Sequence, residues 1–305
     1  MRSALPMLWL DGDRVAGDAT HVSALDRGFT LADGLFETML VRRGQIFRAA
    51  RHLERLHYGA SVLRIALPDN LERWLESAMR EAARELDDAA VRLTVSRGIG
   101  SPGLAPRDAA APTVVITVNR MPTFPPALRE HGLSALTATA RRDERAATAG
   151  VKSLAYTEAI IALMRAHDEG ADEAIFLDSD GHVSEASTSN AFVCSAGALA
   201  TPPLSCGVLP GITREAIIEL APTLGLQVSE RPLSPRELAE ADEAFLTSSL
   251  RGIAPLVRID GRAIGTGTVG PITQSVMRAY AALVERECAA RNERPIEGTV
   301  FGRAR

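Results

Sequence analysis

The sequence is poor in several features that mark particular classes of protein. Its three cysteines, Cys194, Cys206 and Cys288, are odd in number and widely spaced along 305 residues, so they indicate no disulfide framework. Neither they nor the six histidines follow a metal-ligand spacing, and no metal site is predicted. The absence of a signal peptide and of any apolar run of about 18 residues predicts a cytoplasmic protein that does not engage a membrane. The net charge of −4 argues against nucleic-acid binding.

Lysine is the scarcest charged residue. Lys152 is the single lysine among 34 lysine and arginine residues, so the other 33 are arginines. A guanidinium stays protonated at physiological pH, whereas a lysine amine can lose its proton and then attack a carbonyl to form a Schiff base. Chance survival of one lysine on a solvated surface is the alternative. The surroundings of Lys152 must decide between the two.

The first half of the chain alternates predicted hairpins with predicted helices. Turns at Asp11-Gly12 and Arg43-Gly44 each separate two expected strands. Apolar periodicity predicts an amphipathic helix over 48–65 and a second over 70–87, for which Asn70 is a candidate N-cap. Two further strands are expected over 90–98 and 112–120.

A proline-rich segment, "RMPTFPP" at 120–126, is predicted to link a domain of residues 1–119 to a domain of residues 127–305. The second domain combines expected strands with expected helices, the last of them long. One helix has a capping box between Ser234 and Glu237. The predicted fold class is α+β in two domains, with Lys152 early in the second.

Several residues could hold pyridoxal phosphate (PLP), the commonest partner of a Schiff-base lysine. In "LPGITREA", Gly211 precedes a helix start whose free N–H groups suit a phosphate, and Thr213 adds a hydroxyl. Ser249 in "FLTSSL" is another hydroxyl donor, and Arg55 in "RHLERL" can give a phosphate two hydrogen bonds. Each feature alone also fits an ordinary helix cap, strand end or solvated helix face.

Glu185, in "HVSEASTSNAF", is predicted to lie at the end of a strand. A carboxylate against the pyridine nitrogen of PLP would keep that nitrogen protonated, so that the ring can act as an electron sink. The alternative is an ordinary glutamate at an exposed hairpin end.

The order of these motifs resembles one family. Lys152 in "VKSL", Glu185 in "VSEASTSNAF", "LPGITR", and upstream "DRGF", "DGLFET" and "HLERL" are similar to the fold-type IV, or class IV, PLP enzymes. These include branched-chain aminotransferases, D-amino-acid aminotransferases, (R)-selective amine transaminases and aminodeoxychorismate lyase. The resemblance extends from about Trp9 to Ala281.

The resemblance implies a role for each candidate residue. Lys152 would be the Schiff-base lysine and the acid/base of the reaction, and Glu185 the partner of the pyridine nitrogen. Tyr156, matched across a one-residue gap, would hydrogen-bond the phenolic oxygen of the cofactor. The phosphate would be held by Arg55, Gly211, Ile212, Thr213 and Ser249. The family also implies a small N-terminal α/β domain, a larger C-terminal domain, and a homodimer with its active sites near the interface.

The substrate is less well defined by the resemblance. D-amino-acid aminotransferases carry an Arg-x-His carboxylate trap, and Pro102 and Leu104 stand at those places here. The pattern that starts at Arg97-Gly98 is more similar to aminodeoxychorismate lyases, whereas "LPGITR" and "GPIT" are more similar to branched-chain aminotransferases.

We expect transamination between an amino acid or primary amine and a 2-oxo acid, with Arg97 and Arg251 as candidates for binding the substrate carboxylate. Release of pyruvate and 4-aminobenzoate from aminodeoxychorismate is the alternative reaction. A non-catalytic relative that keeps the fold is the second alternative. The intact set of Lys152, Glu185, Arg55 and Thr213 argues against it.

Overall fold

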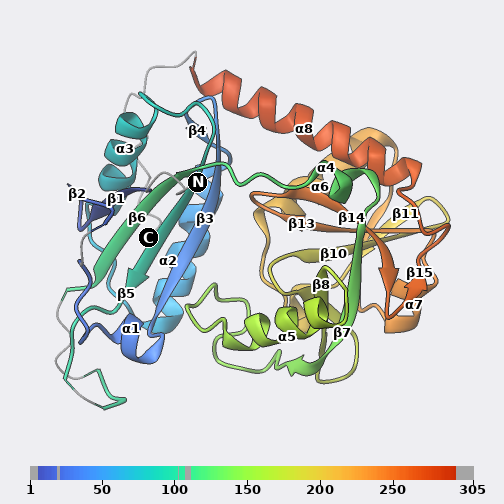
Figure 1. Cartoon of the computed structure of the whole chain (residues 1–305), viewed down its shortest axis with the longest axis horizontal. Coiled ribbons are helices and arrows are strands. Elements are labelled where there is room, and N and C mark those ends of the chain that lie inside the picture. Colours follow the sequence, from blue (N-terminus) through green and yellow to red (C-terminus); the bar gives the residue numbers. More distant parts are fainter. Residues whose placement is uncertain (1–5, 19–20, 102, 107–110, 293–305) are drawn as a thin grey trace, which may run out of the picture.

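The computed structural model describes residues 6–18, 21–101, 103–106 and 111–292. Two β-sheets lie beside each other, and the C-terminal helix runs across both of them (Figure 1). Within the described residues, no helix combines the length and apolarity needed to cross a membrane.

The first sheet has six antiparallel strands in the order β2-β1-β6-β5-β3-β4. The predicted turns are present, with positive φ angles of 50° at Asp11 and 53° at Arg43. The strands are β1 (Met7–Leu10), β2 (Asp13–Val15), β3 (Gly34–Arg42), β4 (Gln45–Ile46), β5 (Ala89–Ser96) and β6 (Thr113–Arg120).

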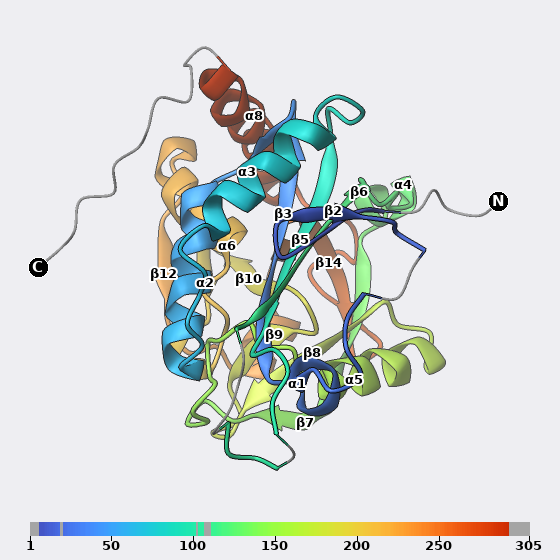
Figure 2. The same cartoon turned by 90° about the vertical axis from the view of Figure 1, so that its left-hand side faces the viewer.

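Helices α2 (Ala49–Leu63) and α3 (Leu71–Ala82) cover one face of this sheet (Figure 2). Their apolar stripes pack on alternate residues of β3 and β5, with Leu56 and Leu75 against Met39 and Val91. Asn70 stands at the predicted N-cap position of α3, but its side chain makes no capping hydrogen bond. The short helix α1 (Arg27–Leu31) was not predicted.

The second sheet has nine strands and closes on itself. Strand β9 pairs with β8 on one side and with β10 on the other, so β10, β13, β14, β7, β8 and β9 form a closed ring. The strands are β7 (Leu133–Arg142), β8 (Glu173–Asp178), β9 (Val183–Ala186), β10 (Asn190–Ser195), β11 (Ala198–Thr201), β12 (Val228–Glu230), β13 (Glu243–Ser248), β14 (Gly252–Ile259) and β15 (Arg262–Ala263).

Helices connect and cover these strands. Helix α5 makes the crossover between the parallel strands β7 and β8. The predicted capping box between Ser234 and Glu237 is confirmed at the start of α7. The elements are α4 (Pro126–Glu130), α5 (Thr157–Asp168), η1 (Leu204–Cys206), α6 (Ile212–Leu220), η2 (Ala221–Leu224), α7 (Pro235–Ala239) and α8 (Pro271–Asn292).

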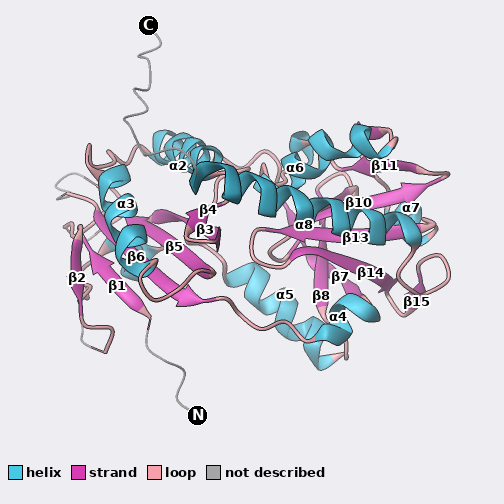
Figure 3. Ribbon diagram, turned by 90° about the horizontal axis from the view of Figure 1, so that it is seen from above, coloured by secondary structure: helices cyan, strands magenta, loops and turns pink. Residues whose placement is uncertain are grey.

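Helix α8 joins the two halves of the molecule, as the view from above shows (Figure 3). Tyr280 and Val284 of α8 share a hydrophobic cluster with Leu40 and Phe47 of the first half and Phe192 of the second. Residues 121–125 between the sheets belong to no helix or strand. The division into domains at 1–119 and 127–305, with a linker at 120–126, stays a prediction. The shared hydrophobic cluster contains residues from both halves, so the halves are not packed independently.

Candidate active site

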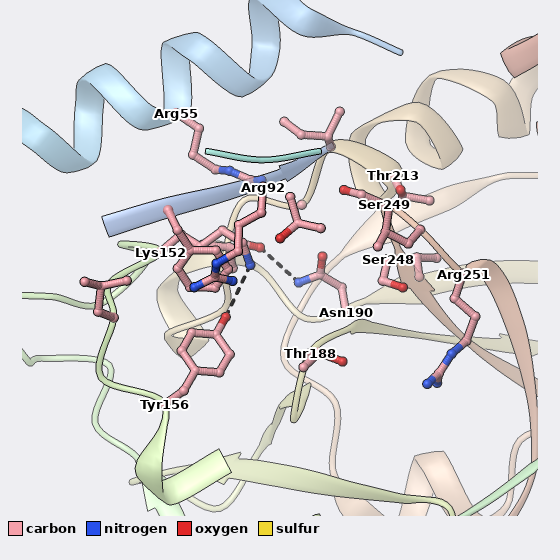
Figure 4. A pocket seen from close by; sticks show the side chains of 18 of the residues that line it. Arg55, Arg92, Lys152, Tyr156, Thr188, Asn190, Thr213, Ser248, Ser249 and Arg251 are labelled. Carbon is pink, nitrogen blue, oxygen red and sulfur yellow. Dashed lines mark hydrogen bonds between the residues drawn. The ribbon is translucent and has the colours of Figure 1, made fainter. Parts of the chain in front are cut away.

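A cavity of about 450 Å³ is lined by residues from both halves of the chain (Figure 4). Strands β3 and β5 and helix α2 form one wall. The segment before α5, the start of α6 and the turn between β13 and β14 form the other. The polar side chains on its walls include Arg55, Arg92, Lys152, Asn190, Thr213 and Arg251.

Lys152 is held at the cavity by main-chain hydrogen bonds to the beginning of β3. Its carbonyl accepts from the N–H of Phe36 at 3.0 Å, and the N–H of Leu154 donates to the carbonyl of Gly34 at 3.0 Å. The half-buried side chain donates from Nζ to the Tyr156 hydroxyl at 3.2 Å (Figure 4). The same Nζ lies 4.5 Å from the centre of the Phe36 ring. The amine therefore has a fixed place within the cavity.

Glu185 lies in β9, opposite Asn190 of β10 at the point where the ring of strands closes. Its carboxylate accepts from the Leu209 N–H at 2.9 Å and from Asn190 Nδ2 at 3.3 Å. Burial raises the pKa of Glu185, against the opposing effects of the Arg142 guanidinium, the Leu209 N–H and the Lys152 and Arg55 charges. The side chain lines a second cavity, of about 310 Å³, which shares Tyr156 and Leu209 with the first.

Helix α6 begins at the opposite end of the cavity. Gly211 stands at its N-cap and no side chain caps the helix, so the amides of the first turn are available to an anion. Thr213 is buried, with its hydroxyl 3.3 Å from that of Tyr280. The Thr247 hydroxyl is also buried and has no hydrogen-bond partner among the described residues. This hydroxyl is available to a ligand at this end of the cavity.

Arg55 reaches the same end of the cavity from α2. Its Nε and Nη2 donate to the Glu37 carboxylate at 2.8 and 2.6 Å, and its Nη1 donates to the Pro210 carbonyl at 2.8 Å. A guanidinium has five N–H groups, so two remain for a ligand. Burial alone would raise the pKa of Glu37, but hydrogen bonds from Arg55 and His52 lower it to about 2. Arg55 is thus held by a permanent anion.

These groups fit PLP. The uncapped helix start, Arg55 and the unpartnered Thr247 hydroxyl suit its phosphate, and the Lys152 amine suits its aldehyde. A buried carboxylate whose pKa is raised suits a ring N–H donor. The backbone also approaches closely, because a Cβ on Gly211 would lie 1.9 Å from Asn190 Oδ1.

The two arginines predicted to bind the substrate carboxylate have different positions. Arg251 lines the cavity, where its buried Nη1 has no hydrogen-bond partner in the described part of the chain and lies 4.0 Å from Glu173 Oε2. Arg97 does not line the cavity. Its donors are directed at the Asp33 carboxylate, at 2.7 and 3.0 Å, and at the Leu63 and Arg64 carbonyls. We therefore do not retain Arg97 as a substrate residue.

Sequence reasoning missed Arg92, which projects from β5 into the cavity. Its guanidinium carbon lies 3.6 Å from the centre of the Phe36 ring, and no carboxylate of the described residues lies within ion-pair distance. The one charged residue in the mostly apolar strand "AAVRLTVS" was the signal that the sequence offered. Leu104 is 84% exposed, and Pro102 lies outside the described residues.

The two-sheet fold and the cavity between its halves are those of a fold-type IV enzyme. Residues 34–259 match the model of the family described as "Amino-transferase class IV". The chain belongs to this family, whose members depend on PLP.

Named relatives are similar over nearly the whole chain. A provisionally named branched-chain-amino-acid aminotransferase of Methanocaldococcus jannaschii is 36% identical, over 90% of this chain and 94% of the relative. The structure of a branched-chain amino acid aminotransferase from T.th., complexed with N-(5'-phosphopyridoxyl)-L-glutamate, is 26% identical, with a TM-score of 0.87, over 95% and 98% of the two chains. The 4-amino-4-deoxychorismate lyase of Pseudomonas aeruginosa is 32% identical, with a TM-score of 0.78, over 89% and 97%.

Proposed function

We propose that the protein is a PLP-dependent transaminase that moves an amino group from an amino acid to a 2-oxo acid, with Lys152 as its catalytic residue. The main support for this proposal is the position of the Lys152 amine. It lies 3.2 Å from the Tyr156 hydroxyl, in a cavity whose far end holds the uncapped start of α6. When bound, PLP supplies the electron sink that stabilises the carbanion formed by loss of the substrate Cα proton.

Residues of the chain would bind the cofactor and transfer the proton. Lys152 Nζ would hold the cofactor aldehyde and, once the substrate amine has displaced it, would carry the proton between the substrate Cα and the cofactor C4′. Tyr156, the hydrogen-bond partner of that amine, fixes its position. Glu185 accepts the pyridine N–H and keeps it protonated. The N–H groups of Ile212 and Thr213, the Ser249 and Thr247 hydroxyls and the Arg55 guanidinium bind the phosphate.

Arg92 and Arg251 favour substrates that carry carboxylates. Both guanidinium groups line the cavity, and neither has a hydrogen-bonded carboxylate among the described residues. An α-amino acid needs one cation, and a dicarboxylic substrate needs two. The T.th. relative forms a complex in which L-glutamate is joined to the cofactor. We therefore propose that a dicarboxylic amino acid or its 2-oxo acid is one substrate.

A half-reaction tests the proposal. Protein reconstituted with PLP is mixed with L- and D-amino acids and with (R)-1-phenylethylamine, without an acceptor. A true donor should remove the visible band of the bound cofactor and release about one oxo product per chain. Lys152→Arg should lose the band and reduce turnover on the order of 10³-fold or more.

Two other outcomes would contradict transamination. If no donor alters the band while aminodeoxychorismate yields 4-aminobenzoate, the protein is a lyase like its Pseudomonas relative. If the purified protein takes up no PLP at all, it is a non-catalytic member of the family.

We further propose that the protein is a cytoplasmic homodimer. Large apolar side chains are exposed just before α1, in α1 and in α5: Leu25 at 66%, Phe29 at 76%, Ile160 at 56% and Met164 at 60%. Apolar surface of this kind fits a second copy of the chain. Light scattering should give twice the mass of one chain, and a stable monomer with full PLP content would contradict the dimer.

A further inference from the structure

Three metal-ligating side chains meet away from the PLP cavity. Asp178 ends β8, His182 precedes β9 across the same hairpin, and Cys206 ends η1. One potential ligand atom from each lies within 4.8 Å of the other two. Asp178 and Cys206 are each 3% exposed, whereas the His182 side chain is 40% exposed and leaves the cluster accessible from solvent.

The main chain holds these residues in place. The Asp178 N–H donates to the His182 carbonyl, and the His182 N–H donates to Asp178 Oδ1, both at 2.8 Å. The second oxygen, Oδ2, remains directed at His182 Nδ1, 3.4 Å away. The Ser184 hydroxyl donates to the Cys206 carbonyl at 2.8 Å and ties the cysteine to the hairpin. The main chain therefore fixes the three residues relative to one another.

The electrostatic field at the cluster is negative. The carboxylates of Asp178, Glu144 and Asp180 all act on the Cys206 thiol. On the outer side, Arg145 pairs with Glu144 at 3.3 Å and with Asp180 at 3.9 Å. A divalent cation would compensate the buried Asp178 charge and make the thiolate the stable form of Cys206.

We propose that Asp178, His182 and Cys206 form a binding site for one thiophilic divalent cation, such as Zn²⁺. Cys206 Sγ, His182 Nδ1 and Asp178 Oδ2 would be the protein ligands, and water would complete a tetrahedral shell. Binding replaces the thiol proton, which leaves to solvent. This site revises the sequence expectation of no metal, because the fold brings Cys206 to a hairpin that is distant in the sequence.

The cation would stiffen the segments that lead into the PLP cavity. His182 is followed in β9 by Glu185, and Cys206 is followed by Leu209, whose N–H donates to Glu185 at 2.9 Å. Occupancy of the cluster therefore fixes both partners of that hydrogen bond relative to each other. Because only the folded protein assembles the three ligands, the cation should also raise the thermal unfolding midpoint.

Cobalt titration of chelator-treated holoenzyme tests the site. Difference spectra should show tetrahedral d–d bands and a thiolate charge-transfer band that saturate at one Co²⁺ per chain, and Zn²⁺ should abolish both. Cys206→Ser should lose the thiolate band and weaken binding at least tenfold. His182→Gln should weaken binding but keep the thiolate band. Cys194→Ser, which alters another buried cysteine, is the matched control and should behave like the parent.

Thermal unfolding provides a second measurement. Zn²⁺ should raise the unfolding midpoint of the parent protein and of Cys194→Ser, but not that of Cys206→Ser. Absence of a thiolate band in the parent protein would overturn the proposal. A band that survives in Cys206→Ser would overturn it equally, since the cation would then sit elsewhere.

Discussion

Glu37 and Arg55 form a buried two-point ion pair, with Nε and Nη2 of the arginine 2.8 and 2.6 Å from the two carboxylate oxygens. The Glu37 and Arg55 side chains are only 1% and 6% exposed. The pair joins β3 to α2, and the third nitrogen of Arg55 bonds to the Pro210 carbonyl beside the start of α6. One carboxylate thus sets the direction of the guanidinium that we assign to the cofactor phosphate.

Replacing Glu37 by glutamine should weaken both the fold and cofactor binding. The amide leaves the Arg55 charge buried without its anion, which costs about 3–5 kcal/mol of unfolding free energy. A less firmly oriented Arg55 should raise the PLP dissociation constant on the order of tenfold, equivalent to about 1.4 kcal/mol. Denaturant unfolding of the apoprotein and spectral titration with PLP measure the two effects.

Glu54→Gln is the matched control, since Glu54 lies on the same helix but its side chain is 56% exposed and pairs with Arg51. It should change neither quantity appreciably. The pKa of Glu37 is lowered from 4.5 to about 2, so its stabilisation is complete above pH 4.5 and disappears as the pH falls toward 2. If Glu37→Gln and parent protein lose stability equally across that window, the ion pair contributes nothing.

Glu185→Gln should stabilise the apoprotein while it impairs the enzyme. The folded protein raises the pKa of Glu185, chiefly by burial, so the charged carboxylate opposes folding once the pH exceeds the ordinary value of 4.5. The neutral amide avoids that cost, and the gain in apoprotein thermal stability should grow as the pH rises above 4.5. Transamination should fall on the order of 10²-fold or more, because the ring nitrogen loses its anion. A variant that is both less stable and fully active would refute this role.

Gly211→Ala should disrupt the cavity through Asn190. The added Cβ would lie 1.9 Å from Asn190 Oδ1, and the Asn190 side chain also donates to Glu185 and to the Leu209 carbonyl. We expect weaker PLP binding, measured by spectral titration. In an Asn190→Ala background the same substitution should cost far less, and the double-mutant cycle should give a coupling of about 1–3 kcal/mol. Strict additivity would show that the clash is relieved elsewhere.

Local signals account for what the sequence predicted correctly. The turn at Asp11-Gly12 and the capping box at Ser234 depend on neighbouring residues only, and their backbone chemistry acts wherever the rest of the chain lies. Lys152 stood out by composition and by its resemblance to a family motif. Its assignment as the Schiff-base residue stays a prediction, although the structure places it in the cavity.

Long-range pairing accounts for what the sequence did not reveal. Nothing near Arg97 shows that Asp33 occupies its donors, and nothing near Arg55 shows that Glu37 holds it. The pairing of β9 with β10, which sets Glu185 beside Asn190, depends on closure of a whole ring of strands. Contacts between distant segments are therefore the physical reason that the sequence could name candidate residues but not their partners.

Arg92 should contribute more to substrate binding than Arg251 does. Glu173 Oε2 lies 4.0 Å from Arg251 and partly neutralises it, whereas no described carboxylate is within ion-pair distance of Arg92. A substrate carboxylate therefore gains more from Arg92, in a charge-assisted hydrogen bond of about 1.5–3 kcal/mol. Arg92→Met should lower kcat/KM for L-glutamate by roughly 10- to 150-fold, and Arg251→Met by less.

Comparison of three donors then locates the carboxylate that Arg92 binds. If it binds the α-carboxylate, L-glutamate and L-leucine should lose kcat/KM equally in Arg92→Met. If it binds a side-chain carboxylate, only L-glutamate should lose. A primary amine without a carboxylate, if it is a substrate, should be unaffected in both cases and serves as the internal control. If kcat/KM is unchanged for both amino acids, Arg92 does not bind the substrate. Loss of a guanidinium that bound either carboxylate would lower kcat/KM for at least one of the two.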